Sequence, residues 1–235
     1  MTGKELESIA FIPDGNRRFA RKSGVNFLKA YQLGTKKAWD VMHWLEEYPR
    51  IRAGTFWMLS LENAQKRKAE LGLLFKIFDR ELDKVKSSGY FEENGIRLKF
   101  FGRLGLLPKS IVQKVREAEE FTQDFGKRTI NLALGYSGRA EIVDAAKALA
   151  LDVRQGKVDL ESVDEKAFEG YLYNEIPSPD LIVRTSGEQR TSGFLAYQSS
   201  YSELHFCRHY WPEFSEQDLA NAVADYDLRK RNFGK

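Results

Sequence analysis

The sequence has one cysteine, three histidines and no long apolar run, and each shortage excludes a class of protein. Cys207 alone cannot form an internal disulfide or a zinc site of four thiolates, so we expect a reducing, cytoplasmic environment. No apolar run approaches the roughly 20 residues of a membrane-spanning helix. The start of the chain mixes lysine with glutamate, unlike a signal peptide. We therefore expect a protein that neither spans nor crosses a membrane.

Net charge is also small, because 37 Lys and Arg residues oppose 34 Asp and Glu residues and leave +3. This balance predicts no nucleic-acid partner, although a local basic cluster could still hold an anion. With 235 residues, 42% of them hydrophobic, the chain can bury a core without disulfides or metal. No Pro-, Gly- or Ser-rich linker divides it, so we expect one domain over residues 1–235.

Short β-rich apolar segments alternate with longer helical ones, which is typical of βα units around a largely parallel sheet. The predicted strands are Ser8–Ile12, Gly54–Leu59, Ile96–Phe101, Thr129–Leu134, Leu181–Thr185 and Glu203–Phe206. The predicted helices are Leu28–Tyr48, Lys68–Ser87, Lys109–Phe125, Arg139–Arg154, Asp164–Tyr173 and Glu216–Lys230. The sequence thus predicts an α/β fold with a six-stranded, mostly parallel sheet flanked by helices.

A polar cluster, Asp14-Gly15-Asn16-Arg17-Arg18, follows the first predicted strand. In open parallel sheets the carboxyl end of a strand faces the ligand crevice, and the next helix offers free N–H groups that attract phosphate. Gly15 allows close backbone approach, Asn16 can cap the helix, and the arginines add positive charge. A carboxylate beside a phosphate is repelled unless a cation lies between them, so Asp14 predicts a bridging Mg²⁺ ion. The alternative is an ordinary Asp-Gly turn with a capping asparagine.

A second cluster follows the strand predicted at Leu181–Thr185. It contains Arg184, Arg190 and Ser192 on a short loop with two glycines. Two guanidinium groups and a hydroxyl on one strand-end loop predict a diphosphate site. The alternative is a loop of surface arginines, but a strand end this rich in arginine, glycine and hydroxyl groups favours function.

Two further polar segments stand near predicted strand ends. Ser60, Glu62 and Asn63 follow the strand at Gly54–Leu59, so three strand ends converge on one rim of the sheet. The last segment supplies Glu203 as a second acidic group.

Alternate residues His205, Cys207 and His209 raise the alternative of a zinc site, because alternate residues of a strand share a face. A structural role is favoured, since the single cysteine provides one thiolate and a fourth ligand is not identified.

The helix predicted over Lys68–Ser87 has a continuous apolar face. Its members recur at steps of three and four: Leu71, Leu74, Phe75, Phe78, Leu82 and Val85. Such a face either packs on the sheet or forms the wall of an aliphatic ligand site, and periodicity alone does not separate the two.

Taken in order, these segments resemble the cis-prenyltransferase family, that of the undecaprenyl and dehydrodolichyl diphosphate synthases. The resemblance covers nearly the whole chain. The matching segments are Asp14–Phe19 for the DGN-x-R signature, Ser60–Asn63 for S-x-E-N, Arg184–Phe194 for R-T-x-G-E-x-R-x-S-x-F, and Tyr201–Leu204 with Trp211-Pro212 for the Y-x-E-L and WP ending.

The resemblance implies an undecaprenyl diphosphate synthase-like fold. It also implies a Mg²⁺-dependent enzyme that condenses isopentenyl diphosphate with an allylic prenyl diphosphate to give a cis-polyprenyl diphosphate. Some relatives are non-catalytic partner subunits, which is the main alternative, and a phosphate-ester-binding protein is a further one. The intact DGN segment and loop arginines favour the enzyme.

The same resemblance assigns roles to residues. It implies that Asp14 and Glu203 bind Mg²⁺, and that Asp14, Ser60 and Asn63 are catalytic, the last two orienting the isopentenyl substrate and removing its proton. The residues implied to bind substrates are Gly15, Asn16, Arg17 and Arg18 for the allylic diphosphate, Arg184, Arg190 and Ser192 for isopentenyl diphosphate, and Phe19, Tyr31 and Lys66 without assignment to one of the two.

The chain departs from the family pattern mainly around the allylic site. Tyr31 and Lys66 stand where bacterial members have a histidine and an arginine, and Phe27 replaces another arginine. Ala64, Gln189 and Arg208 are further departures. The preferred allylic substrate and the product length therefore stay open.

The end of the chain, Arg229–Gly234, resembles the family's basic tail with Asn232 in place of an arginine. The resemblance implies a homodimer, with the sheet and a helix pair at the interface. Peripheral membrane contact would suit an insoluble polyprenyl product, although no basic amphipathic anchor is evident.

Overall fold

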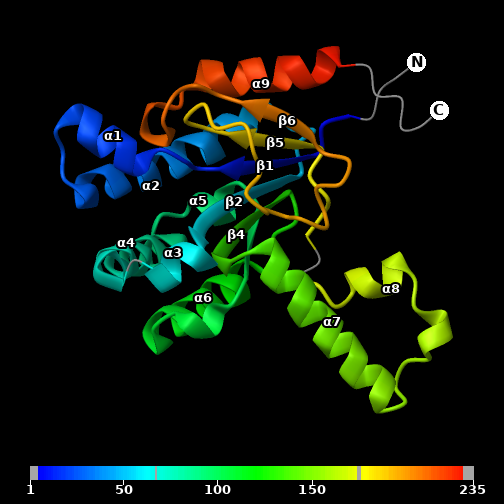
Figure 1. Ribbon diagram of the computed structural model, residues 1–235. Coiled ribbons are helices and arrows are strands. Elements are labelled where there is room, and N and C mark those ends of the chain that lie inside the picture. Colours follow the sequence, from blue (N-terminus) through cyan, green and yellow to red (C-terminus); the bar gives the residue numbers. More distant parts are fainter. Residues whose placement is uncertain (1–4, 67, 174–175, 230–235) are drawn as a thin grey trace.

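The computed structural model describes residues 5–66, 68–173 and 176–229. At its centre is a six-stranded sheet of order β3-β4-β2-β1-β5-β6, whose neighbouring strands are parallel (Figure 1). The strands are β1 (Ser8–Ile12), β2 (Ala53–Ser60), β3 (Ile96–Phe101), β4 (Arg128–Tyr136), β5 (Leu181–Arg184) and β6 (Glu203–Phe206). The predicted α/β fold and all six predicted strands are confirmed.

The longer predicted helices are also confirmed, the one over Lys68–Ser87 with the predicted bounds and the others with different ends. The helices are α1 (Asn16–Ser23), α2 (Phe27–Trp44), α3 (Leu61–Lys66), α4 (Lys68–Ser87), α5 (Tyr90–Glu93), α6 (Lys109–Thr122), α7 (Gly138–Arg154), α8 (Glu165–Glu169) and α9 (Glu216–Leu228). The helix predicted over Asp164–Tyr173 is wrong in extent, because α8 ends before Gly170. The end predicted for the last helix, Lys230, lies outside the described residues.

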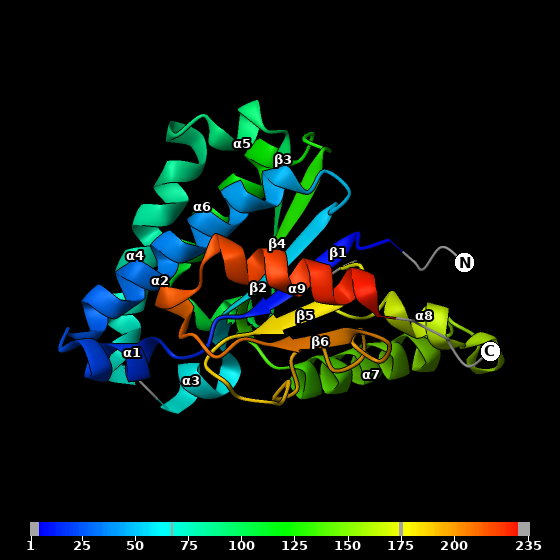
Figure 2. The ribbon, with the colours of Figure 1, turned by 90° about the horizontal axis from the view of Figure 1, so that it is seen from above.

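The two faces of the sheet are both buried, which explains the uninterrupted apolar run of β1. Successive side chains of a strand point to opposite faces. Ile9 and Phe11 join a core with α2, α4, α6 and α9, whereas Ala10 and Ile12 pack with Phe194 on the other face. Figure 2 shows α2 and α9 lying over the sheet.

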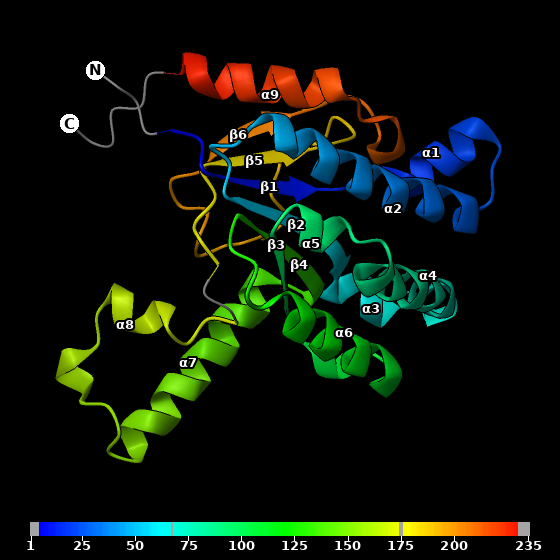
Figure 3. The ribbon, with the colours of Figure 1, turned by 180° about the vertical axis from the view of Figure 1, so that it is seen from behind.

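The helix α7 starts at the end of β4 and leads away from the sheet. Figures 1 and 3 show α7 and α8 as an arm that projects from the body of the protein. Within the described part of the chain, no helix has the length and apolar character needed to cross a bilayer.

The strand order places a crevice beside β1. This strand lies between β2 and β5, and the chain builds outward to β3 and β4 on one side before crossing to β5 and β6 on the other. In such sheets ligands bind outside the carboxyl ends of the strands where the order reverses. The fold therefore brings the polar residues after β1, β2 and β5 to one place.

Candidate active site

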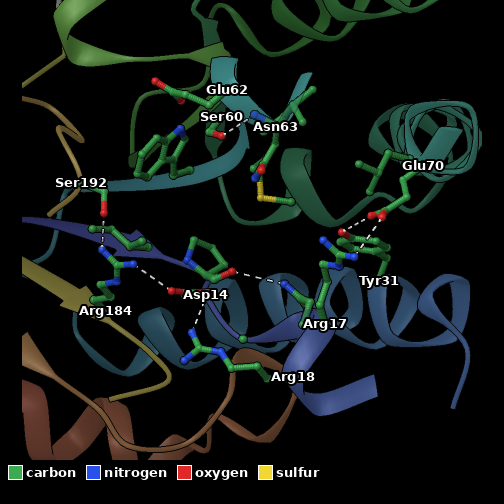
Figure 4. Close-up of a pocket in the computed structure, with 18 of the residues that line it drawn as sticks. Asp14, Arg17, Arg18, Tyr31, Ser60, Glu62, Asn63, Glu70, Arg184 and Ser192 are labelled. Atoms are coloured by element: carbon green, nitrogen blue, oxygen red, sulfur yellow. Dashed lines mark hydrogen bonds and ion pairs between the residues drawn. The ribbon is translucent and has the colours of Figure 1, made fainter. Parts of the chain in front are cut away.

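A pocket of about 660 Å³ opens at the carboxyl ends of β1, β2 and β5 (Figure 4). Its walls carry five arginines and three carboxylates, so it suits an anionic ligand. The charged residues that line it are Arg17, Arg18, Arg21, Arg184, Arg190, Asp14, Glu62 and Glu70. The predicted convergence of three strand ends on one rim is confirmed.

Asp14 lies at the centre of this pocket between two guanidinium groups. Its Oδ2 accepts a hydrogen bond from Nη2 of Arg184 at 2.8 Å, and its Oδ1 lies 3.2 Å from Nη2 of Arg18. Burial disfavours the charged carboxylate, but the hydrogen bonds and charges of Arg184 and Arg18 outweigh it and lower the pKa of Asp14 below its ordinary value. Asp14 is therefore an anion held by two cations.

Arg184 organises the loop that follows β5. Its buried guanidinium donates through Nη1 to the carbonyl oxygen of Arg190 at 2.5 Å and to Oγ of Ser192 at 2.8 Å. Ser192 has a φ of 54°, in the left-handed region, so the loop curls tightly around Arg184. Nε of Arg184 is buried and has no hydrogen-bond partner among the described residues.

Glu188 joins the two arginine clusters. Its Oε1 accepts from Arg18 at 2.6 Å and its Oε2 accepts from Arg190 at 2.5 Å. These hydrogen bonds lower the pKa of Glu188, so its carboxylate stays charged. The carboxylates of Asp14 and Glu188 thus alternate with three arginines in one chain of ion pairs.

The start of α1 forms another wall of the pocket. Gly15, with a φ of 102°, is the residue before the helix, and no side chain caps the first turn. Asn16 is the first helical residue and donates to the carbonyl oxygen of Pro13 at 3.2 Å, so the predicted capping role of Asn16 is wrong. The uncapped N–H groups of α1 are therefore available for an anion.

Tyr31 and Arg17 meet Glu70 at the far side of the pocket. The Tyr31 hydroxyl donates to Oε2 of Glu70 at 3.1 Å, and Nη2 of Arg17 lies 3.5 Å from its Oε1 (Figure 4). The Arg17 guanidinium also lies 5.0 Å from the ring centroid of Phe27. Two of the departures from the family pattern, Tyr31 and Phe27, therefore fix the position of Arg17.

Ser60 and Asn63 lie across the pocket from Asp14. Ser60 ends β2, and its Oγ accepts from the backbone N–H of Asn63 at 3.1 Å in the first turn of α3. Both residues line the pocket, as predicted.

The predicted apolar face of α4 lines a cavity wall. Leu71 and Leu74 lie in the pocket around Asp14, and Phe78, Leu82 and Val85 lie in a second, apolar cavity between α2, α4 and the sheet. Met58 borders both spaces, so the apolar cavity begins where the polar pocket ends. All six residues of the stripe also belong to the hydrophobic core or pack against it, so the stripe both packs on the sheet and borders these two spaces.

The structure does not bring two of the predicted substrate-binding residues, Phe19 and Lys66, into the pocket. Phe19 is about 200° around α1 from Arg17, so the helix turns its side chain away. Lys66 is exposed at the end of α3. Neither residue is among those that line the pocket.

The predicted metal pair of Asp14 and Glu203 does not form within one chain. Glu203 opens β6 and pairs in register with Leu181, whereas the site lies beyond Arg184 at the opposite end of these strands. Its Oε2 accepts from Nη1 of Arg229 at 2.5 Å. The order of residues along the sequence does not show which end of a strand faces the site.

Glu70, Arg21 and Trp57 line the pocket but were not predicted as site residues. Glu70 directly precedes the apolar face of α4, and Arg21 lies one helical turn beyond Arg17 and Arg18. In the sequence, only these positions pointed to Glu70 and Arg21 as site residues, and neither position is specific to a binding site.

The three residues considered for a zinc site, His205, Cys207 and His209, do not come together in the structure. His205 bonds instead to Asp225 at 3.1 Å, while Cys207, His209 and Asp218 place one ligand atom each within 4.8 Å of one another. Asp218 also caps α9 by accepting from Ser215. Burial raises the pKa of the Cys207 thiol to about 11, so it is a neutral thiol at neutral pH. His205, Cys207 and His209 thus have structural roles in these contacts, as favoured from the sequence.

Comparison with known proteins supports the same chemistry. A family model described as "Putative undecaprenyl diphosphate synthase" matches residues 12–234. The chain is 41% identical over 228 residues to a tritrans,polycis-undecaprenyl-diphosphate synthase (geranylgeranyl-diphosphate specific) of Thermoplasma acidophilum, covering 97% of this chain and 88% of that protein. It is also 41% identical over 230 residues to a protein of the same name from Pyrobaculum aerophilum, covering 97% and 95%.

A solved structure shows the same fold. The crystal structure of lavandulyl diphosphate synthase from Lavandula x intermedia, in complex with dimethylallyl diphosphate, superposes with a TM-score of 0.91 at 32% identity. The match covers 97% of each chain.

Proposed function

The chain belongs to the undecaprenyl diphosphate synthase family and is a cis-prenyltransferase, and from this premise we propose that its reaction takes place in the pocket around Asp14. There it condenses isopentenyl diphosphate with an allylic prenyl diphosphate. The observation that carries the proposal is the position of Asp14, between Arg18 and Arg184, at the point where a basic pocket leads past Met58 into an apolar cavity.

The charges of the pocket match two diphosphate groups. The first turn of α1 and the arginines Arg17 and Arg18 would bind the allylic diphosphate. Arg184, Arg190 and Ser192 would bind the isopentenyl diphosphate. As the allylic C–O bond breaks, negative charge grows on the departing diphosphate, and cations already fixed beside it lower the barrier.

The side of the pocket formed by Ser60 and Asn63 would hold the double bond of isopentenyl diphosphate. Ser60 and Asn63 lie there together, at the end of β2 and the start of α3. We assign them the orientation of this substrate and the acceptance of the proton that leaves when the new bond forms.

We also propose that Mg²⁺ acts in this pocket and that Asp14 is its one protein ligand in the chain. Mg²⁺ is commonly bound by one or two carboxylates together with substrate phosphates. Both oxygens of Asp14 are paired with arginines, and bound phosphates would take over those guanidinium groups and leave the carboxylate to the ion. The ion would supply further stabilisation of the departing diphosphate.

For the allylic substrate we propose geranylgeranyl diphosphate, because the relatives from Thermoplasma acidophilum and Pyrobaculum aerophilum are named as specific for it. The apolar cavity beyond Met58 would accept its chain. Its lining is almost wholly carbon, which suits a hydrocarbon and excludes water.

One assay tests the activity. Purified protein is incubated with labelled isopentenyl diphosphate, Mg²⁺ and a C5, C15 or C20 allylic diphosphate, and labelled product is extracted. We expect fastest incorporation with C20, and loss of incorporation in EDTA. Equal rates with all three would contradict the substrate proposal, and activity in EDTA would contradict the role of Mg²⁺. Asp14→Ala is the negative control, and incorporation at the parent's rate would overturn the assignment of the pocket.

We further propose a cytoplasmic homodimer that touches membranes only peripherally. The turn before the edge strand β6 presents Tyr201 and the end of α9 presents Leu228, which are 85% and 83% exposed. Edge strands and exposed apolar side chains are commonly covered by a partner. Light scattering after size-exclusion chromatography should give twice the mass of one chain. The Leu228→Glu variant should give a lower average mass, because its charge would weaken the interface.

A further inference from the structure

We propose that Cys207, His209 and Asp218 also form a binding site for a divalent transition-metal ion, with Zn²⁺ as the ion that suits them. The site lies between the end of β6 and the start of α9, and none of the three residues lines the pocket around Asp14. The inference therefore does not rest on the proposed function. Its basis is the meeting of a thiol, an imidazole and a carboxylate at one place.

The three side chains have a spacing that suits one ion. A ligand atom from each, the Cys207 sulfur, a His209 ring nitrogen and an Asp218 carboxylate oxygen, lies within 4.8 Å of the other two. Nδ1 of His209 is 3.1 and 3.0 Å from the two carboxylate oxygens of Asp218. Tetrahedral Zn²⁺ holds such ligands at about 2.0–2.3 Å, which places them roughly 3.3–3.8 Å from one another. Small side-chain adjustments would therefore bring all three onto one ion.

Two of the ligands are held in position by the fold. The backbone N–H of Cys207 donates to the carbonyl oxygen of Arg184 at 2.8 Å, which continues the pairing of β6 with β5. Oδ2 of Asp218 accepts from the backbone N–H and the hydroxyl of Ser215 at 2.8 and 2.7 Å. Outer hydrogen bonds of this kind orient a carboxylate that binds a metal. The cluster is thus partly organised for an ion.

Burial gives the site a closed side and an open side. Cys207 is 6% exposed, whereas the His209 side chain is 58% exposed. An ion would enter past the imidazole, and water on that side would supply a fourth ligand. A thiol that binds such an ion loses its proton, which here passes to solvent. The thiolate and the Asp218 carboxylate then balance the two positive charges of the ion.

The types of ligand distinguish this site from the proposed Mg²⁺ site. Thiolate and imidazole suit Zn²⁺ and neighbouring transition metals, whereas Mg²⁺ prefers oxygen ligands. The ion at Cys207 would therefore differ from the ion at Asp14.

The backbone connects this site to the loop after β5. The N–H of Ser186 donates to the carbonyl oxygen of His209 at 2.6 Å, and the N–H of Gly187 donates to that of Cys207 at 2.8 Å. An ion that fixes Cys207 and His209 would also fix these two acceptors. Bound Zn²⁺ should therefore slow hydrogen exchange at the amides of Ser186 and Gly187.

The test measures metal binding directly. The full chain is treated with a chelator, exchanged into buffer with a phosphine reductant, and titrated with Zn²⁺ by calorimetry and with Co²⁺ by absorption spectroscopy. We expect saturation at one Zn²⁺ per chain, a rise in Tm with Zn²⁺, and the ultraviolet absorption of a cobalt–thiolate bond. Absence of Zn²⁺ binding by the parent would overturn the inference.

Variants then assign the ligands. Cys207→Ser and His209→Asn should each weaken Zn²⁺ binding by at least about 10-fold, and Cys207→Ser should also remove the cobalt–thiolate absorption. His205→Asn is the matched control, because His205 precedes the cluster and bonds to Asp225 instead. It should bind Zn²⁺ like the parent.

Equal Zn²⁺ binding by the parent, Cys207→Ser and His209→Asn would overturn the site. Loss of Zn²⁺ binding in Asp14→Asn would do the same, because it would place the ion in the pocket. If Cys207→Ser does not fold, as judged by circular dichroism, His209→Asn decides, since that side chain is largely exposed. Unchanged hydrogen exchange at Ser186 and Gly187 with Zn²⁺ bound would overturn the connection to the loop.

Discussion

Asp14 and Arg184 lie on the adjacent strand ends of β1 and β5, with Oδ2 of the carboxylate 2.8 Å from Nη2 of the guanidinium. They are 170 residues apart in the sequence. The side chain of Arg184 is only 6% exposed, so its buried charge is compensated by Asp14 and by the acceptors of its own loop. This contact ties together the two loops proposed to bind the substrates, so the proposed binding of an anion and of Mg²⁺ would be interdependent.

The first prediction follows from this contact. Asp14→Asn should lower kcat by about 100-fold or more, because the proposed Mg²⁺ ion would lose its carboxylate. It should also strengthen the binding of inorganic pyrophosphate in EDTA, since the removed charge repels anions. Thermal unfolding with and without pyrophosphate measures this, and the rise in Tm should be larger for the variant. A smaller rise in the variant than in the parent would contradict an anion site beside Asp14.

A second prediction concerns Glu188, which links Arg18 to Arg190. Glu188→Gln should raise KM for both substrates by about 3- to 10-fold, because each diphosphate loses an arginine fixed in position. Stability should change little, since the pairs are partly exposed and screened by solvent.

Asp40→Asn is the control for Glu188→Gln, because Asp40 also lies between two cations, Lys36 and Lys37, but away from the pocket. It should leave both KM values unchanged. A rise confined to one substrate in Glu188→Gln would show that Glu188 does not couple the two sites.

The strands were predictable because the sequence marks them with buried apolar runs and clear ends. Pro13 follows β1, and the predicted ends of β1, β3 and β6 agree with the structure. The helix predicted beyond Glu169 was wrong, although Gly170 was a visible stop signal.

The site was predictable where polar residues directly follow a strand, as at Asp14 and Ser60. It was not predictable where contacts join distant helices. Trp39 and Glu81, 42 residues apart, meet only because α2 and α4 pack across one cavity. The prediction that Glu203 and Asp14 bind one metal ion within a chain was wrong for a related reason. A sequence motif gives the residue type but does not show which end of a strand the residue occupies.

A third prediction concerns pH. Burial acts to raise the pKa of Asp218, but hydrogen bonds from the Ser215 hydroxyl and backbone N–H, together with His209, lower it below its ordinary value of 3.8. A carboxyl whose pKa is lowered by folding stabilises the protein above its unfolded pKa, and this contribution is lost as pH falls through the folded pKa.

Asp218→Asn should therefore reduce the free energy of unfolding by about 1–2 kcal/mol at pH 7, because α9 loses its charged cap. The difference between parent and variant should shrink below pH 3.8. Urea unfolding at several pH values measures it. A difference that stays constant down to the lowest pH would show that the charge of Asp218 does not stabilise the cap.

The last prediction separates backbone strain from crowding at two glycines that flank α1. Gly15 and Gly24 have φ angles of 102° and 66°, so both favour glycine. A Cβ added at Gly15 would lie 2.7 Å from Cδ1 of Tyr210 and 2.9 Å from Cβ of Ser186, whereas one added at Gly24 meets nothing within 4 Å.

Gly24→Ala should therefore cost about 1 kcal/mol of stability, from strain alone, and leave activity unchanged. Gly15→Ala should cost more, about 2–4 kcal/mol, because Tyr210 and the loop at Ser186 must also shift. That loop carries the arginines proposed to bind isopentenyl diphosphate, so its KM should rise in Gly15→Ala and stay constant in Gly24→Ala. Equal losses of stability in the two variants, with equal KM values, would mean that the close packing of Gly15 does not position the loop.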